Sequence, residues 1–419
     1  MQASGIALRV ILIAFFVSLI GIASFGAGVA LERYIIGPST EAGSGGDRTI
    51  SSLERDTGDS PEVTLGLIEE VLELLQEEYY YGDVDREDLI YSALEGMVGG
   101  VSDQYTVFLR PAEARMSRQQ LSGEYEGIGV WVDQPDGRLT IVTPMRGSPA
   151  EDAGLQSGDV VLEVDGESIE DLPMEEAVRR VRGPEGTSVN LTIERPGEDE
   201  VLTFNVERAR IELPAVMFEM QDDIAVLTVT LLGDNTIDEL DDAIQQAQEA
   251  GANGIVLDLR SNGGGWVSTA QEMVGRFVPV DAGPALHERR APDSDDPTSL
   301  PIIAGDASEY DVPMVVLVNG STASSAEIVA GALQEYERAT IVGVQTLGKG
   351  SIQRIHTFDD GSSVRVTIAE WLTPEQNAIQ DNGITPDVEV EVPGAEDEEY
   401  DAERDLQLER AIEILLDSD

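Results

Sequence analysis

The residue whose chemistry stands out in this 419-residue chain is its single lysine, Lys349, which lies in a G-K-G turn. Every other member of the 26 lysines and arginines is an arginine. Arginine keeps its proton at ordinary pH, whereas a desolvated lysine can lose it and then act as a base. Ser324 lies 25 residues upstream, at the start of a predicted helix. A serine hydroxyl becomes a nucleophile when a base takes its proton, so Ser324 and Lys349 could form a catalytic dyad.

The same residues also have plainer interpretations. Ser324 and Glu327 have the S-x-x-E spacing of a capping box, which would give the serine a structural role at its helix. Ser321 and Ser325 are rival nucleophiles in the same turn, and G-K-G could be an exposed turn. If the segment after the lysine is extended, residues 349 and 353 point the same way, so Gln353 could reach and orient Lys349.

Composition excludes several other chemistries. Cysteine is absent, which removes disulfides, thiol nucleophiles and cysteine-based zinc sites. The two histidines, His287 and His356, lie far apart and outside any H-E-x-x-H motif, so a zinc protease is not expected. Either could serve a Ser-His-Asp triad, but an ordinary surface or half-buried histidine is the better interpretation of both. No metal, nucleotide or other cofactor is implied.

The chain carries 81 acidic against 26 basic residues, a net charge of −55. Phosphate would be repelled by such a surface, so nucleic acid is excluded as a partner. We interpret the charge as adaptation of a solvated surface to high salt, where self-repulsion is screened; the alternative is solubility alone. Comparing stability and activity at low and molar salt distinguishes the two.

The N-terminus contains 22 residues without a charge, Val10 to Leu31. As a helix this segment would be roughly 33 Å long, enough to cross a bilayer. We therefore expect residues 1–36 to be an uncleaved membrane anchor, with the rest of the chain outside the cytoplasm. Ala27–Ala30 could instead offer a signal-peptide cleavage site. Residues 37–62 are rich in Gly, Ser, Thr and Asp and predict a flexible linker.

The spacing of apolar residues along the chain then changes twice. Residues 63–122 show helical spacing of apolar residues and predict a small helical unit that packs on another surface or pairs with a second copy. Residues 123–210 read as strands interrupted by one helix, and E-G-I-G-V followed by S-P-A-E-D-A-G-L-Q-S-G-D-V-V-L-E-V-D-G resembles a PDZ domain. Such a domain binds a peptide as an added strand, with its terminal carboxylate on backbone N–H groups. The expected peptide-binding residues are Gly127, Ile128, Gly129, Val130, Val178 and Val181.

From residue 211 to 394 strands and helices alternate, which predicts a mainly parallel sheet with helices on its faces. The predicted helices include Thr236–Ala250 and Val267–Phe277. Residues 281–309 are polar and contain proline, and predict a loop insertion. Residues 395–419 are expected to form an acidic linker and a short amphipathic helix, Leu406–Leu416.

The motifs D-L-R-S-N-G-G-G, V-L-V-N-G-S-T-A-S-S-A-E-I-V-A-G-A-L and G-K-G-S-I-Q, behind a PDZ domain, resemble those of the C-terminal processing peptidases, or tail-specific proteases. The resemblance runs from about residue 63 to the C-terminus. It implies an α/β protease core of the crotonase/Clp-peptidase type with an inserted β-rich PDZ domain. It also implies that Ser324 is the nucleophile, Lys349 the general base and Gln353 the residue that orients the lysine.

The resemblance further implies an oxyanion hole formed by the backbone N–H groups of Ser325 and Gly265, although Gly264 is adjacent. The chain departs from the family where S-A-S-E is usual, because here the order is S-S-A-E. Ala326 therefore replaces a serine, and any helper role of that serine is in doubt.

The expected function is that of a membrane-anchored serine endopeptidase that recognises protein C-terminal tails and cleaves near them. Assembly with copies of itself through the helical unit is a further expectation. The first alternative is a catalytically inactive PDZ scaffold that binds peptides. A hydratase-like role of the core, by analogy of fold alone, has no motif in its favour.

Overall fold

The computed structural model describes residues 64–170, 172–198, 200–292, 296–304, 311–392 and 404–417. The expected membrane anchor and linker, residues 1–62, lie outside these described residues. Within the described ranges, no helix is both long enough and apolar enough to cross a bilayer. The chain divides into two compact units, and the smaller one contains residues 64–113 and 353–367.

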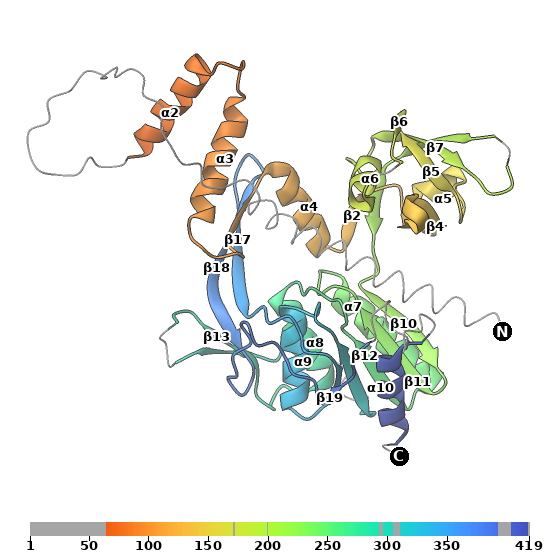
Figure 1. Cartoon of the computed structure of the whole chain (residues 1–419). Helices are drawn as coiled ribbons and strands as arrows, with labels where there is room; N and C mark the ends of the chain where they lie inside the picture. Colours follow the sequence, from red (N-terminus) through yellow and green to blue (C-terminus); the bar gives the residue numbers. More distant parts are fainter. Residues whose placement is uncertain are drawn as a thin grey trace, which may run out of the picture. The chain divides into compact units, whose positions relative to one another are not determined.

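Two helices and part of a hairpin build the smaller unit (Figure 1). The Asp85 carboxylate caps the second helix by accepting the N–H groups of Glu87 and Asp88. Tyr91 of this helix is buried beside Phe108, with ring centroids 6.0 Å apart. The elements are α2 (Leu65–Glu78), α3 (Arg86–Gly99), β1 (Val107–Leu109) and parts of β17 (Ser351–Thr357) and β18 (Ser363–Leu372). Helix α4 (Pro111–Leu121) follows in the chain.

The N-terminal helical unit is thus helical as expected, but it also contains a segment from near the other end of the chain. Strand β1 pairs antiparallel with β18, with Val107 opposite Arg365. Within α2 a single residue, Leu72, is buried. The expected pairing of this unit with a second copy or another surface stays a prediction.

A β-rich domain lies within the larger unit. Its sheet has the strand order β3-β4-β5-β7-β8, with β6 paired to β5. Strand β7 alternates between buried and exposed residues, so that Val189, Leu191 and Ile193 enter the core at 0% exposure. The elements are β2 (Glu124–Gly127), β3 (Val130–Asp133), η2 (Pro135–Gly137), β4 (Thr140–Pro144), α5 (Pro149–Ala153), β5 (Val160–Val164), β6 (Glu167–Ser168), α6 (Met174–Val181), β7 (Ser188–Glu194), β8 (Leu202–Glu207) and β9 (Ala209–Glu212), which pairs with β2.

The centre of the larger unit is a six-stranded sheet in the order β10-β11-β12-β15-β16-β19. All neighbours are parallel except β10 and β11, which are antiparallel. Every residue of β12 and β15 is buried, as expected for strands with helices on both faces. The elements are β10 (Val216–Gln221), β11 (Ile224–Val229), α7 (Thr236–Ala250), β12 (Gly254–Asp258), α8 (Val267–Phe277), β15 (Met314–Val318), α9 (Ser325–Glu335), β16 (Thr340–Gly343), β19 (Val388–Glu389) and α10 (Leu406–Leu416).

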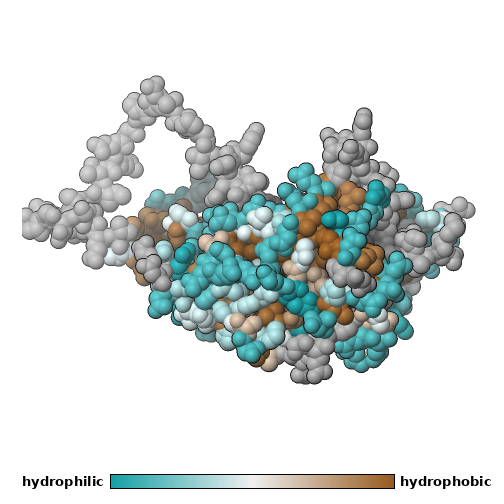
Figure 2. All heavy atoms as spheres, turned by 90° about the horizontal axis from the view of Figure 1, so that it is seen from below, coloured by the Kyte–Doolittle hydropathy of each residue, from teal (hydrophilic) through white to brown (hydrophobic). Residues whose placement is uncertain are grey.

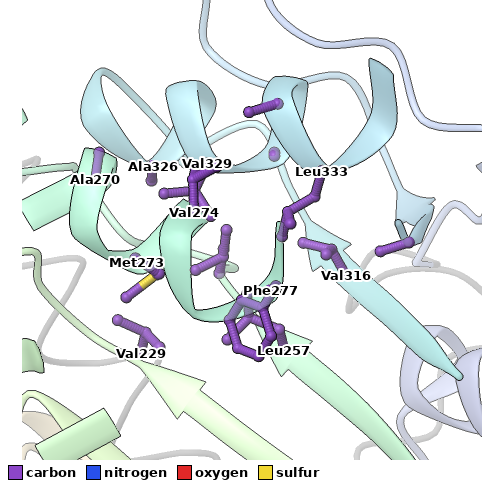
Figure 3. Packing of buried hydrophobic residues seen from close by; sticks show 14 of the residues in the cluster. Val229, Leu257, Ala270, Met273, Val274, Phe277, Val316, Ala326, Val329 and Leu333 are labelled. Atoms are coloured by element: carbon purple, nitrogen blue, oxygen red, sulfur yellow. The ribbon is translucent and has the colours of Figure 1, made fainter. Parts of the chain in front are cut away.

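Helices α7, α8 and α9 pack on one face of this sheet and α10 on the other (Figure 1). In Figure 3, Ala326 and Val329 of α9 lie beside Val274 of α8, above the strand residues Leu257 and Val316. This packing fixes the first turn of α9, which follows Ser324. The outer surface is different in character: the face in Figure 2 is mostly hydrophilic, in keeping with the acidic composition.

The prediction of a loop over residues 281–309 was wrong in part. Strands β13 (Pro284–Arg289) and β14 (Thr298–Pro301) form there, and β13 also pairs with β18, His287 lying opposite Leu372. His287 is buried between the Pro374 carbonyl, 2.9 Å from Nε2, and the Ser299 hydroxyl, 3.2 Å from Nδ1. These contacts give His287 a structural role in tying three segments together.

Candidate active site

Three turns leave the carboxyl ends of neighbouring parallel strands, and together they form the candidate active site. The first follows β12 and contains the three glycines, the second follows β15 and ends at Ser324, and the third follows β16 and contains Lys349. Because carboxyl ends of parallel strands meet at one edge of a sheet, the strand order β12-β15-β16 brings these turns side by side.

Ser324 has an unusual backbone conformation, with φ 57° and ψ −125° at the N-cap of α9. A non-glycine residue held at such angles costs about 1–3 kcal/mol, which the surrounding contacts must offset. Asn319 supplies part of this support, because its Oδ1 accepts the N–H groups of Ser261 and Ser321, both within 3.0 Å. Ser324 is half-buried, whereas the adjacent Ser325 is fully buried.

The glycine turn packs directly against Ser324. Asn262 is fully buried and holds this turn: its Nδ2 donates to the Val229 carbonyl and its Oδ1 accepts the Gly264 N–H, both at 2.9 Å. A Cβ at Gly264, whose φ is +94°, would lie 2.8 Å from Cβ of Ser324 and 2.9 Å from N of Ser325. Only glycine therefore allows this close approach.

Two backbone N–H groups, one in the serine turn and one in the glycine turn, are unpaired within the part of the chain that the structure describes. Among the described residues, neither Ser325 N–H nor Gly265 N–H has a hydrogen-bond partner, whereas Gly264 N–H is bound by Asn262. This pattern favours Gly265 over its neighbour as the second donor of an oxyanion hole. The Ser325 hydroxyl is buried at 0% exposure without a partner, so it is a poor rival as a nucleophile.

The turn that carries Lys349 is compact because a later segment packs on it. A Cβ at Gly350 would lie 2.4 Å from N of Gln380, and one at Gly348 would lie 3.0 Å from N of Gly383. The Lys349 carbonyl accepts the indole N–H of Trp371 at 3.0 Å. Gly350 is thus required by packing and Gly348 is favoured by its φ of +84°, while Lys349 itself is half-buried.

Glu327 joins the serine turn to the lysine turn. The sequence predicted its contact with the serine turn, as a capping box, but not its contact with the lysine turn. Its carboxylate accepts the Ser324 N–H at 2.7 Å, as a capping box predicts. It also accepts the Lys349 N–H at 2.9 Å and the Gly348 N–H at 2.7 Å. Burial raises the pKa of Glu327, and these hydrogen bonds lower it in part. The S-x-x-E spacing was the available signal, but the contacts across 21 and 22 residues could not be read from it.

Gln353 lies on β17 in the smaller unit, where it is half-buried. Its Nε2 lies 3.5 Å from Oγ1 of Thr367 on β18. Thr367 N–H donates to the Thr106 hydroxyl, whose own proton goes to Asp103 at 2.5 Å. The role of Gln353 in orienting Lys349 stays a prediction.

The β-rich domain contains an apolar pocket beside its edge strand β3. The predicted residues Ile128 and Val130 line this pocket, as do Val178 and Val181 from α6. Gly129, at φ +76°, has no room for a side chain, because a Cβ would lie 2.4 Å from Cβ of Ser148. Sequence reasoning missed the remaining lining residues, which are Tyr125, Trp131, Val132, Leu139, Ile141, Met145, Val161, Arg182, Leu191 and Leu213.

An edge strand next to an apolar pocket is the arrangement that accepts an extended peptide. Strand β3 ends the strand order of its sheet, so one side of its backbone is available for pairing. Arg182 lies over the Tyr125 ring, 4.7 Å from its centroid, at one wall of the pocket. No group of histidine, aspartate and glutamate among the described residues has the arrangement of a metal site.

Comparison with known proteins agrees with both parts of the fold. The profile of peptidase family S41 matches residues 223–390, and that of the PDZ domain matches residues 140–195. The carboxy-terminal processing protease CtpA of Bacillus subtilis (strain 168) is 36% identical over 315 residues, 75% of this chain and 66% of that protein. A "Probable CtpA-like serine protease" of Staphylococcus aureus (strain MSSA476) is 33% identical, over 83% of this chain and 68% of the relative.

Among solved structures, a photosystem II D1 C-terminal processing protease is 28% identical, over 77% of this chain and 86% of that one, with a TM-score of 0.45. The chain spans about two thirds of the length of the bacterial relatives, 66% of the Bacillus protein and 68% of the staphylococcal one. The fold and the turns described above define an S41-type peptidase core with a PDZ domain. The chain belongs to the family of carboxy-terminal processing, CtpA-like serine proteases.

Proposed function

We propose that the protein is a serine endopeptidase that binds the C-terminal tail of a protein through its PDZ domain and cleaves the chain with a Ser324/Lys349 dyad. The observation that carries this proposal is the junction at Glu327, which ties the turn of Ser324 to the turn of Lys349. The strained backbone of Ser324 and the N–H groups of Ser325 and Gly265, which have no partner among the described residues, add support.

The proposed reaction begins with transfer of the Ser324 Oγ proton to a neutral Lys349 amine. Oγ attacks the scissile carbonyl, and the N–H groups of Ser325 and Gly265 stabilise the resulting oxyanion. Lys349 then returns the proton to the leaving amine, which leaves an acyl group on Oγ. A water molecule, activated by the same lysine, releases the acyl group. Gln353 is proposed to orient the amine through these steps.

Reaction with a fluorophosphonate tests the proposal directly. The probe should label Ser324, and labelling should disappear in the Ser324→Ala variant. If tail peptides bind tightly but neither labelling nor peptide turnover occurs at any salt concentration, the chain is an inactive peptide-binding scaffold instead.

Tail recognition by the PDZ pocket gives a separate prediction. Val178→Asp should weaken binding of a peptide with an apolar C-terminal residue about tenfold or more, because a carboxylate would enter an apolar pocket. Fluorescence polarisation with a labelled peptide measures the change. The matched control is Val201→Asp, at an apolar residue that is 59% exposed and outside the pocket. Equal affinities of the two variants, or undiminished binding of an amidated peptide, would argue against recognition of a free tail.

We further propose that residues 10–31 anchor the protein in a membrane, with the catalytic part on the extracytoplasmic side. The support is the run of 22 uncharged residues in the sequence. The full chain should remain in the membrane fraction after an alkaline carbonate wash, whereas a chain that begins at residue 37 should be released. Release of both forms would contradict the proposal that residues 10–31 anchor the protein.

A further inference from the structure

The side chain of Glu327 has an environment that helix capping alone does not explain. It is buried at 0% exposure, in the first turn of α9. Four groups donate hydrogen bonds to its two carboxylate oxygens, and only one of them belongs to the helix cap. The donors are Ser324 N–H at 2.7 Å, Gly348 N–H at 2.7 Å, Lys349 N–H at 2.9 Å and the Thr346 hydroxyl at 2.5 Å.

These four contacts fit a carboxylate and no other form of the side chain. Three of the partners are backbone N–H groups, which can only donate. The Thr346 hydroxyl already accepts the Ile384 N–H at 2.7 Å, so its own proton is directed to Glu327. A protonated carboxyl or an amide would place a hydrogen against one of these donors. The contacts therefore require four acceptor positions, the number that an ionised carboxylate offers.

We propose that ionised Glu327 is a positioning residue for the reaction: it holds the turn of Ser324 against the turn of Lys349 at a fixed distance. The inference rests on the proposed function, in which these two residues are nucleophile and base. Glu327 does not act on the substrate, because its oxygens are occupied by the two turns. A proton transfer between two separately anchored turns is sensitive to their separation, and a shift of about 1 Å can cost roughly a hundredfold in rate.

Helix α9 contains a matched control at its other end. Glu335 also joins the helix to a distant segment, accepting the Thr373 hydroxyl at 2.5 Å, the Glu375 N–H at 2.7 Å and the Asn377 amide at 2.8 Å. It is a carboxylate of the same helix with a comparable set of donors, but its partners lie outside the candidate active site. A general loss of helix anchoring should affect both glutamates, whereas loss of positioning should affect Glu327 alone.

The first experiment compares Glu327→Gln with Glu335→Gln in the full chain. We expect kcat to fall about a hundredfold in Glu327→Gln while KM stays within about twofold, and both constants to stay within about twofold in Glu335→Gln. The rate of fluorophosphonate labelling at Ser324 should fall in parallel with kcat, because labelling needs no tail in the PDZ pocket. Equal kcat values for the two variants, or a change confined to KM, would overturn the proposal.

The second measurement uses the unmodified protein and does not depend on the folding of a variant. Burial raises the pKa of Glu327, so its charge should be lost on acidification before that of an ordinary exposed glutamate. A raised pKa in the folded state means that protonation of this group does not destabilise the fold. Lys349 must be neutral to act as the base, so its own protonation already gives one acid limb in kcat. We expect protonation of Glu327 to add a second ionisation, so that log kcat falls with a slope above one on acidification, at pH values where circular dichroism still reports a native fold.

The charged residues on the turn of Lys349 and on the segment packed against it, residues 380–384, are Lys349 and Asp381. Asp381 donates its backbone N–H to the Gly348 carbonyl, but its side chain is exposed and accepts Gln380. The pH profile of an Asp381→Asn variant should therefore keep both ionisations, and that of Glu327→Gln should keep only the single limb that belongs to Lys349. A slope above one that persists in Glu327→Gln would overturn the proposal. If the Ser324→Ala variant is labelled as the wild type is, the proposed function fails instead, so the two failures are distinguishable.

Discussion

Replacing either Ser324 or Lys349 by alanine should abolish peptide cleavage while leaving the fold intact. In a proposed Ser/Lys dyad each residue depends on the other, so either loss should lower kcat by about 10⁴-fold or more. Lys349→Arg should be equally inactive, because a guanidinium keeps its proton and cannot serve as the base. Turnover of an unfolded protein substrate measures the loss, and circular dichroism checks the fold. Near-normal activity in any of the three variants would contradict the dyad.

The neighbouring serines are the matched controls for this experiment. Ser321→Ala and Ser325→Ala remove hydroxyls from the same turn and should retain activity within a few-fold. Ser325→Ala should also leave stability unchanged or raise it, because the hydroxyl that it removes is buried without a partner. The backbone N–H proposed for the oxyanion hole stays in place in that variant. Loss of activity in Ser325→Ala but not in Ser324→Ala would identify Ser325 as the nucleophile instead.

The regular elements of the core could be predicted from the sequence because local pattern determines them. Helices α7, α8 and α10 begin and end at the expected residues, 236–250, 267–277 and 406–416. Apolar residues repeat at helical spacing in α7, where Ile237, Leu240 and Ile244 enter the core. A parallel sheet also follows from alternating elements, and its order then brings the three turns of the site together.

The parts that could not be predicted depend on contacts between distant residues. Strands β13 and β14 form in a polar, proline-containing segment because β18 offers a partner more than sixty residues later, with Arg289 opposite Glu370. For the same reason the sequence could not show that residues 353–367 complete the N-terminal helical unit. Glu327 is the clearest case at the site: its local pattern predicts a cap, and only the fold brings Gly348 and Lys349 to the same carboxylate.

The choice between Gly264 and Gly265 was also open in the sequence, because three consecutive glycines carry no distinguishing pattern. Their environments in the fold differ. The Gly264 N–H is bound by Asn262, whereas Gly265 has φ +156° and a Cβ there would lie 2.1 Å from the Leu232 carbonyl oxygen. Each glycine is therefore required for its own reason, Gly264 for close packing on Ser324 and Gly265 for close packing on the backbone of Leu232.

Gly264→Ala should lower kcat about a hundredfold or more, although it adds a single methyl group. The added Cβ would lie 2.8 Å from the Ala323 carbonyl oxygen and from Cβ of Ser324, and the φ of +94° disfavours any side chain. The turn must move, and Ser324 and the Ser325 N–H would move with it, so kcat should fall more than KM rises. Gly263→Ala is the matched control in the adjacent position, where a Cβ meets nothing within 4 Å, and it should change kcat by no more than about twofold. Steady-state kinetics of the two variants tests this prediction, and thermal unfolding confirms that both variants fold. If Gly264→Ala is as active as Gly263→Ala, then close packing of this turn on Ser324 is not needed for the reaction.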